Sequence, residues 1–217
     1  TGFAGIVGDR TPARKGHAYR SWRYGPAAFK VDLAVRGGVP WTSEAARKAG
    51  TVHVGGSPEN VVHAEGEVVA GRMPERPFIL LAQQYLADPT RSAGDVHPIW
   101  AYAHVPHGWT GDATGVILDE IERYAPGFRS RIVGQRVMTP SDYEAYNGNY
   151  VGGDIAMGAN TIPQLVARPA LSADPYDTGV PGMYLCSAST PPGAGVHGMC
   201  GYRAAQSALK HLATLDG

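Results

Sequence analysis

The glycine-rich segment PPGAGVHG, residues 191–198, has the clearest chemical character in the sequence. Its last six residues, GAGVHG, fit the G-x-G-x-x-G pattern of a dinucleotide-binding turn. The apolar run MYLCSA at 183–188 predicts a buried strand before the turn, and residues 198–215 show the apolar spacing of a helix after it. Such a turn directs backbone N–H groups and the positive end of a helix dipole at a phosphate or an electron-rich ring carbonyl.

The rest of an ordinary dinucleotide fingerprint does not follow this segment. The fingerprint opens a βαβ unit of roughly 30 residues, with an acidic ribose ligand about 20 residues further on. Here the sequence ends at Gly217, directly after the predicted helix. One alternative is a turn that only packs a helix on a sheet, and the other is contact with a different part of a nucleotide.

Aromatic residues on one predicted strand form a second candidate site. Trp100, Tyr102 and His104 alternate with small or aliphatic residues, so the three rings point to one face of the strand. If that face borders a pocket, the rings line a hydrophobic substrate site. If it faces the core, they are ordinary aromatic packing.

The other reactive residues predict little chemistry of their own. Asp154 and Arg168 are expected to form a buried ion pair, with cofactor contact as the alternative. Cys186 and Cys200 lack C-x-x-C spacing, which predicts two reduced thiols rather than a redox pair. The eight histidines are scattered, so no metal site is expected, and no catalytic residue can be assigned. His197 lies within the glycine turn and is either structural or close to a bound ring.

Composition excludes several classes of function. The 217 residues are 43% hydrophobic and 18% charged, which is typical of a soluble globular protein, and we expect a cytoplasmic one. Nineteen basic and nineteen acidic residues cancel, so nothing indicates a nucleic-acid partner. No apolar run approaches the length of a transmembrane helix.

The apolar patterns predict an α+β protein with a mixed β-sheet. Strands are expected at 27–35, 51–56, 77–85, 97–105 and 130–140, and helices at 40–50, 57–71, 112–127, 139–146 and 198–215. We predict a substrate-binding domain at 1–178 and a C-terminal strand-turn-helix at 179–217. The loop at 147–178 is expected to cover a ligand or an interface, because long loops without secondary structure are otherwise uncommon.

Stretches along most of the chain are similar to one family of proteins. They are YGPAAFKVDLAV, PWTSEAARKAGTVHVGG, RPFILLAQQYLADPTRSAG, WAYAHVPHG, IERYAPGF, NYVGGDIAMGA and PGMYLCSASTPPGAGVHGMCGYRAA. The sequence resembles the C-terminal part of phytoene-desaturase-like FAD-dependent oxidoreductases, in the branch of pyridine nucleotide-disulphide oxidoreductase domain-containing proteins. In that family an N-terminal βαβ unit holds the ADP pyrophosphate, and a C-terminal strand-turn-helix closes over the flavin ring.

The resemblance implies FAD as cofactor, with GAGVHG as a contact on the flavin side. The implied cofactor-binding residues are Ser189, Thr190, Gly195, Val196, His197, Gly198 and Met199. The family usually has Gly-Asp shortly after the last strand, where this sequence has Ala188 and Ser189, so a carboxylate ligand is missing there. The hydroxyl group of Ser189 or Thr190 is expected to donate a hydrogen bond in its place.

The implied function is a dehydrogenase or desaturase that acts on a hydrophobic substrate. The chain lacks the N-terminal FAD-binding motif, so we expect FAD in the complete protein and an inactive chain without its N-terminal half, which is the implied partner. A homo-oligomer is a further alternative. The alternative functions are a non-catalytic binding or assembly module and an amine-oxidase-type flavoenzyme.

Overall fold

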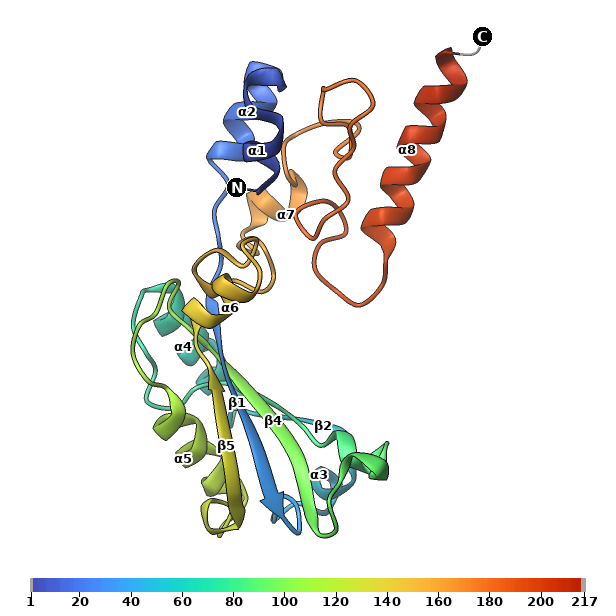
Figure 1. The fold of residues 1–217 in the computed structure, drawn as a ribbon. Coiled ribbons are helices and arrows are strands. Elements are labelled where there is room, and N and C mark those ends of the chain that lie inside the picture. Colours follow the sequence, from blue (N-terminus) through green and yellow to red (C-terminus); the bar gives the residue numbers. More distant parts are fainter. Residues whose placement is uncertain (1, 216–217) are drawn as a thin grey trace.

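The computed structural model describes residues 2–215, and Figure 1 shows a β-sheet at one end of the molecule and helices with long loops at the other. The predicted α+β class is confirmed. The strands are β1 (Ala27–Arg36), β2 (Thr51–Val54), β3 (Ile79–Ala82), β4 (Val96–Val105) and β5 (Ile132–Met138). The α-helices are α1 (Gly2–Val7), α2 (Ala13–Arg20), α3 (Glu44–Lys48), α4 (Pro58–Val69), α5 (Thr114–Tyr124), α6 (Pro140–Tyr146), α7 (Ile162–Val166) and α8 (Met199–Leu215). Short 3-10 helices lie at Gly8–Arg10, Gln84–Leu86, Pro89–Arg91, Arg129–Arg131 and Val151–Gly153.

The sheet has the strand order β2-β3-β4-β1-β5. All four neighbouring pairs are antiparallel, so the sheet is not the mixed one that we expected. The two longest strands, β1 and β4, pair along their whole length, from Ala27 opposite Val105 to Arg36 opposite Val96. Each of these strands was predicted from its apolar pattern.

The core lies on one face of the sheet. Every second residue of β1 from Phe29 to Val35 is at most 4% exposed, and Ile117 and Ile121 of α5 belong to the same apolar cluster. Burying such a side chain contributes about 1.5–3 kcal/mol. The period of two in β1 and the helical spacing in α5 therefore both arise from contact with this core.

Local hydrogen bonds determine where several helices begin. Ser57 caps α4 and forms a reciprocal capping box with Asn60, and Pro58 occupies the first turn. Thr139 and Asp142 form the same arrangement at α6. These caps satisfy backbone N–H groups that have no partner inside the helix.

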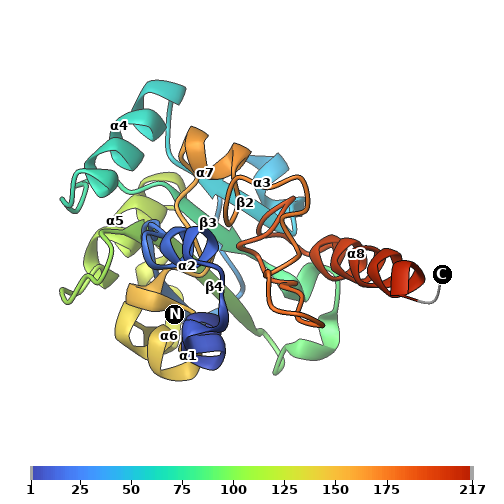
Figure 2. The same cartoon turned by 90° about the horizontal axis from the view of Figure 1, so that it is seen from above.

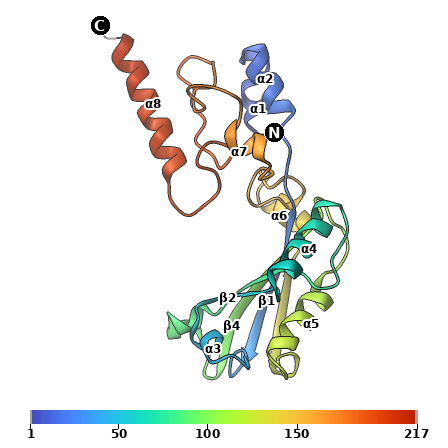
Figure 3. The ribbon, with the colours of Figure 1, turned by 180° about the vertical axis from the view of Figure 1, so that it is seen from behind.

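The N-terminal helices pack against the long loops that precede α8. Figures 1 and 2 show α1 and α2 beside these loops, and Figure 3 shows α8 projecting away from the sheet. Lys15 of α2 forms an ion pair with Asp177 at 2.9 Å. The guanidinium group of Arg14 donates a hydrogen bond to the Leu171 carbonyl at 3.0 Å.

The predicted strand at 183–188 is not present. Residues in this run form a single antiparallel bridge, between Asp177 and Tyr184, and Cys186 is exposed. An apolar run becomes a strand only when another strand offers its backbone groups for pairing. In the described part of the chain no such strand lies beside residues 183–188, so the glycine turn follows an irregular segment.

Candidate functional site

An open cleft of about 840 Å³ lies between the N-terminal segment and the glycine turn. Phe3 and Ile6 of α1 line one side, Trp22 and Tyr24 follow α2, and residues 193–195 and 197–198 form the opposite side. The wall is mostly apolar. Such a lining suits a planar ring whose polar edge is held by a few donors.

The glycine turn leads into the cleft through backbone conformations that favour glycine. Gly193 has φ +106° and Gly198 has φ +60°. A Cβ atom on Gly198 would meet no atom within 4 Å, so this residue faces open space. Gly198, Cys200 and Gly201 all line the cleft, which places the N-terminal end of α8 and its positive dipole at the cleft wall.

The structure brings several predicted cofactor residues to this cleft. Ser189, Gly195, His197 and Gly198 line it. The Oγ atom of Ser189 is hydrogen-bonded to that of Ser187 at 2.5 Å. Their contact with a cofactor stays a prediction.

Three other predicted residues do not line the cleft. Thr190 is fully buried, and its Oγ1 donates a hydrogen bond to the Ser187 carbonyl at 2.7 Å. Val196 projects fully into solvent. Met199 begins α8, and its N–H donates to Nδ1 of His197 at 3.1 Å, so this histidine acts as a helix cap. Thr190 and His197 thus have structural hydrogen bonds of their own.

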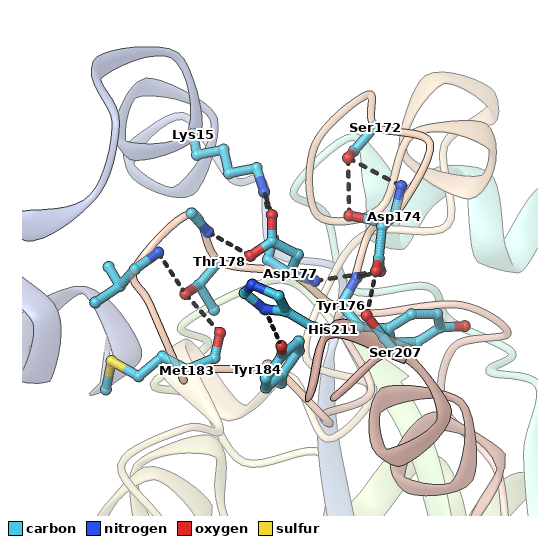
Figure 4. Close-up of polar contacts among 12 residues, drawn as sticks. Lys15, Ser172, Asp174, Tyr176, Asp177, Thr178, Met183, Tyr184, Ser207 and His211 are labelled. Atoms are coloured by element: carbon cyan, nitrogen blue, oxygen red, sulfur yellow. Dashed lines mark hydrogen bonds and ion pairs between the residues drawn. The ribbon is translucent and has the colours of Figure 1, made fainter. Parts of the chain in front are cut away.

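A polar network attaches α8 to the loops that form the cleft wall, as Figure 4 shows. The hydroxyl group of Ser207 donates to Asp174, and the hydroxyl group of Tyr184 is hydrogen-bonded to Nδ1 of His211 at 2.6 Å. Helix α2 joins the same region through its ion pair with Asp177. Elements from both ends of the sequence therefore hold the cleft in place.

Asp154 organises the loop behind the cleft. It is 1% exposed, and its carboxylate accepts hydrogen bonds from the N–H groups of Gly25, Ala156 and Gly158 at 2.7–2.8 Å. The Gly25 contact ties this loop to the segment that enters β1. Leaving such buried donors without an acceptor costs about 1–3 kcal/mol each, so Asp154 is a structural residue.

The expected ion pair between Asp154 and Arg168 does not form. Arg168 is 3% exposed, and its Nε and Nη2 atoms are buried without a hydrogen-bond partner among the described residues. Its guanidinium group lies 5.5 Å from the ring centroid of Trp22. Burial lowers the pKa of Arg168, although the charge of Asp154 acts in the opposite direction. The two groups therefore interact electrostatically without a direct hydrogen bond, and the Asp154 oxygens bind backbone N–H groups instead.

The predicted substrate residues form a row along β4. Trp100 and Tyr102 stack with ring centroids 6.1 Å apart, and Tyr102 and His104 follow at 5.8 Å. The residues between them, Ala101 and Ala103, are 0% exposed in the core. The row therefore lies on the sheet face opposite the core, where its three rings are half-buried. It does not line the cleft, and its role in substrate binding stays a prediction.

Charged and phenolic groups surround this row. Nδ1 of His104 is 2.8 Å from the Glu65 carboxylate of α4, and the Lys30 ammonium group lies 5.8 Å from the Trp100 ring centroid. Burial, with the nearby Asp32 charge, raises the pKa of Tyr143 on α6 to about 12. The sheet face thus combines aromatic rings with groups that can hold or exchange a proton.

Two classes of site are absent from the described residues. Between residues 2 and 215, no group of three or more His, Cys, Asp or Glu side chains could hold a metal ion. Within the same residues, no helix is both long and apolar enough to cross a membrane.

Sequence reasoning missed the parts of the site that depend on tertiary contacts. The helices α1 and α2 carry little apolar periodicity, so their share of the cleft was not predicted. Glu65 belongs to α4, and nothing in the sequence places it beside His104. The apolar spacing in β4 was the signal that found the aromatic row.

Comparisons with known proteins support the family expected from the sequence. The chain is 31% identical over 175 residues to pyridine nucleotide-disulfide oxidoreductase domain-containing protein 2 of Rattus norvegicus, a match that covers 75% of this chain and 30% of that protein. The mouse protein of the same name is 29% identical over the same coverage. A phytoene desaturase (lycopene-forming) of Pseudescherichia vulneris is 29% identical over 57% of this chain and 26% of that protein. No family model matches the chain. The chain thus spans about a third of the length of these relatives, and the family resemblance is confirmed for this segment.

Proposed function

We propose that this chain, which belongs to the phytoene-desaturase-like family of oxidoreductases, supplies a substrate-binding sheet and one wall of the FAD site in a dehydrogenase or desaturase. The observation that carries this proposal is the glycine turn, which opens a mostly apolar cleft at the N-terminal end of α8. A remaining part of a longer protein would supply the rest of the FAD site.

The residues of the cleft fit one side of a flavin. Phe3 and Trp22 offer apolar surface for a planar ring, and the turn at Gly198 allows the backbone to approach a ring edge without a side chain between them. The dipole of α8 favours negative charge at that edge. FAD held here would supply the electron acceptor for a hydride, while these residues position the ring and exclude water.

The aromatic row on β4 is the surface that we assign to the substrate. Trp100 and Tyr102 present stacked rings on the sheet face that the core leaves free. Flat apolar surfaces of this kind bind hydrophobic or unsaturated molecules. Glu65 and His104 at one end of the row could accept a proton when a substrate C–H bond is oxidised.

Two alternatives remain distinct from this function. In an amine-oxidase-type enzyme the same sheet face would bind an amine, and the Glu65 carboxylate near the row favours a cation there. In a non-catalytic binding or assembly module the cleft would hold no flavin. A test that detects bound flavin separates the module from both enzymes.

The experiment is to co-express this chain with the remaining N-terminal part of a longer relative and to record the absorbance spectrum of the purified complex. One equivalent of flavin supports the oxidoreductase function. A stable complex without flavin bands contradicts it and favours the assembly module. If flavin is present, its reduction by an amine but not by a polyene would identify the amine-oxidase alternative.

A further inference from the structure

Arg168 carries a buried guanidinium group in which two nitrogen atoms have no hydrogen-bond partner. The side chain is 3% exposed, and the two atoms are Nε and Nη2. A buried guanidinium group normally binds a carboxylate, a phosphate or several carbonyl oxygens, because an isolated charge in the interior is costly. The nearby acid, Asp154, is occupied by the backbone N–H groups of three residues.

Arg168 does not itself line the cleft, but it lies directly behind residues that do. Its guanidinium group lies against Trp22 on one side. On the other side, Nη1 is only 2.5 Å from the position that a Cβ atom of Gly193 would take, so a side chain at Gly193 would clash with it. Trp22 and Gly193 both line the cleft, and so does Cys200 in the first turn of α8. The charge and the helix dipole therefore act on the same part of the cleft.

We propose that Arg168 supplies a positive charge behind the cleft wall and that this charge stabilises the negatively charged part of a bound nucleotide. This role rests on the proposed flavin site and adds the charge that the ligand must carry there. Two parts of a flavin nucleotide carry negative charge and could be stabilised by Arg168. One is a phosphate group, and the other is the isoalloxazine ring after reduction. The absence of a side chain at Gly193 gives the guanidinium group its place beside the cleft wall.

The first experiment separates this role from a structural one by comparing stability with binding. The 217-residue chain and the variants Arg168→Met, Arg168→Lys and Arg203→Met are titrated with inorganic pyrophosphate, FMN and riboflavin, and thermal unfolding is recorded for each. Arg203→Met is the matched control because it removes an exposed charge from α8.

We expect Arg168→Met to keep or raise the unfolding temperature, since it removes a buried group in which two nitrogen atoms have no hydrogen-bond partner. It should weaken anion binding at least about tenfold, because the ligand loses its interaction with this charge. Arg168→Lys should retain part of the affinity, and Arg203→Met should bind like the wild-type chain. If the anion is a phosphate group, Arg168→Met should bind pyrophosphate and FMN more weakly than the wild type does, while its affinity for riboflavin should not change. If the anion is the reduced ring, Arg168→Met should weaken the binding of reduced riboflavin, titrated without oxygen. Its binding of oxidised riboflavin should match that of the wild type.

Several results would overturn the role of Arg168. One is a wild-type chain that binds none of the three probes. Another is an Arg168→Met variant that unfolds at a lower temperature and binds like the wild type. If Arg168→Met does not fold, equal binding by Arg168→Lys and the wild type, with a lower unfolding temperature, also overturns it. A chain that binds pyrophosphate through Arg168 but binds no flavin would support the anion site and overturn the flavin assignment alone.

Discussion

At the scale of single residues, the surroundings of Tyr143 raise the pKa of its phenol group. It lies in an edge-to-face contact with Tyr150, and burial with the charge of Asp32 raises its pKa from 10.0 to about 12. A raised pKa means that the folded protein holds the phenolic proton more tightly than the unfolded chain. The resulting stabilisation is complete below the unfolded value and is lost as the pH rises towards about 12.

Between about pH 10 and 12, we therefore expect the free energy of unfolding to fall less steeply in Tyr143→Phe than in the wild type. Urea unfolding across this pH range measures the difference. Tyr146→Phe is the control, because Tyr146 lies on the same helix and is 79% exposed. If the free energy of unfolding depends on pH in the same way in Tyr143→Phe and the wild type, the Tyr143 phenol does not cause the loss of stability at high pH.

Gly198 gives the second prediction at this scale. Its φ of +60° is unfavourable for a β-branched residue by about 1–2 kcal/mol, and a side chain there would enter the open cleft. Gly198→Val should abolish flavin retention in the co-expressed complex, measured by absorbance per mole of protein. Gly66→Ala is the control, because Gly66 lies within α4, does not line the cleft, and has room for a Cβ atom. Unchanged flavin content in Gly198→Val would remove the turn from the cofactor site.

At the scale of elements, β4 carries two different faces, and their variants should behave differently. Trp100→Ala and Tyr102→Ala alter the free face, so they should weaken the binding of an apolar probe such as ANS while flavin content stays unchanged. Phe29→Ala on the core face of β1 is the comparison, since Phe29 is 1% exposed and its truncation should cost about 3–5 kcal/mol. If the two β4 variants lose flavin and stability together, the row supports the fold rather than a substrate.

The elements also show what the sequence could predict. Ser57 with Asn60 and Thr139 with Asp142 act within one helical turn, so their caps could be read directly from the sequence. The apolar run at 183–188 could not be read in the same way, because a strand depends on a neighbour that may lie anywhere in the chain or in a partner. The sequence likewise could not show that the Asp154 carboxylate binds three backbone N–H groups rather than Arg168.

At the scale of the whole molecule, a small junction joins the cleft to the sheet. The N–H group of Gly25 donates to Asp154 at 2.7 Å, and its carbonyl oxygen is 3.1 Å from Nδ1 of His107, directly before β1 begins. The Gly108 N–H group donates to the Gly152 carbonyl at 2.9 Å in the same region. The loop behind the cleft and the sheet are therefore joined by three hydrogen bonds, two of which use a side chain and one of which joins backbone groups.

The last prediction concerns the 217-residue chain by itself, which should purify without stoichiometric FAD. Its cleft offers one helix dipole, worth about 0.3–1 kcal/mol, the charge of Arg168 behind its wall, and a few hydrogen bonds worth about 1 kcal/mol each. These contacts are too weak to replace a loop that binds the pyrophosphate and an acid that binds the ribose, neither of which is present in this sequence. The sheet should still fold, because β1, β4 and α5 bury their core without the cofactor. An absorbance spectrum after gel filtration measures the flavin content, and circular dichroism confirms the fold. One equivalent of flavin that survives gel filtration would show that the described cleft is a complete FAD site and that no further part of a longer protein is needed to hold the cofactor.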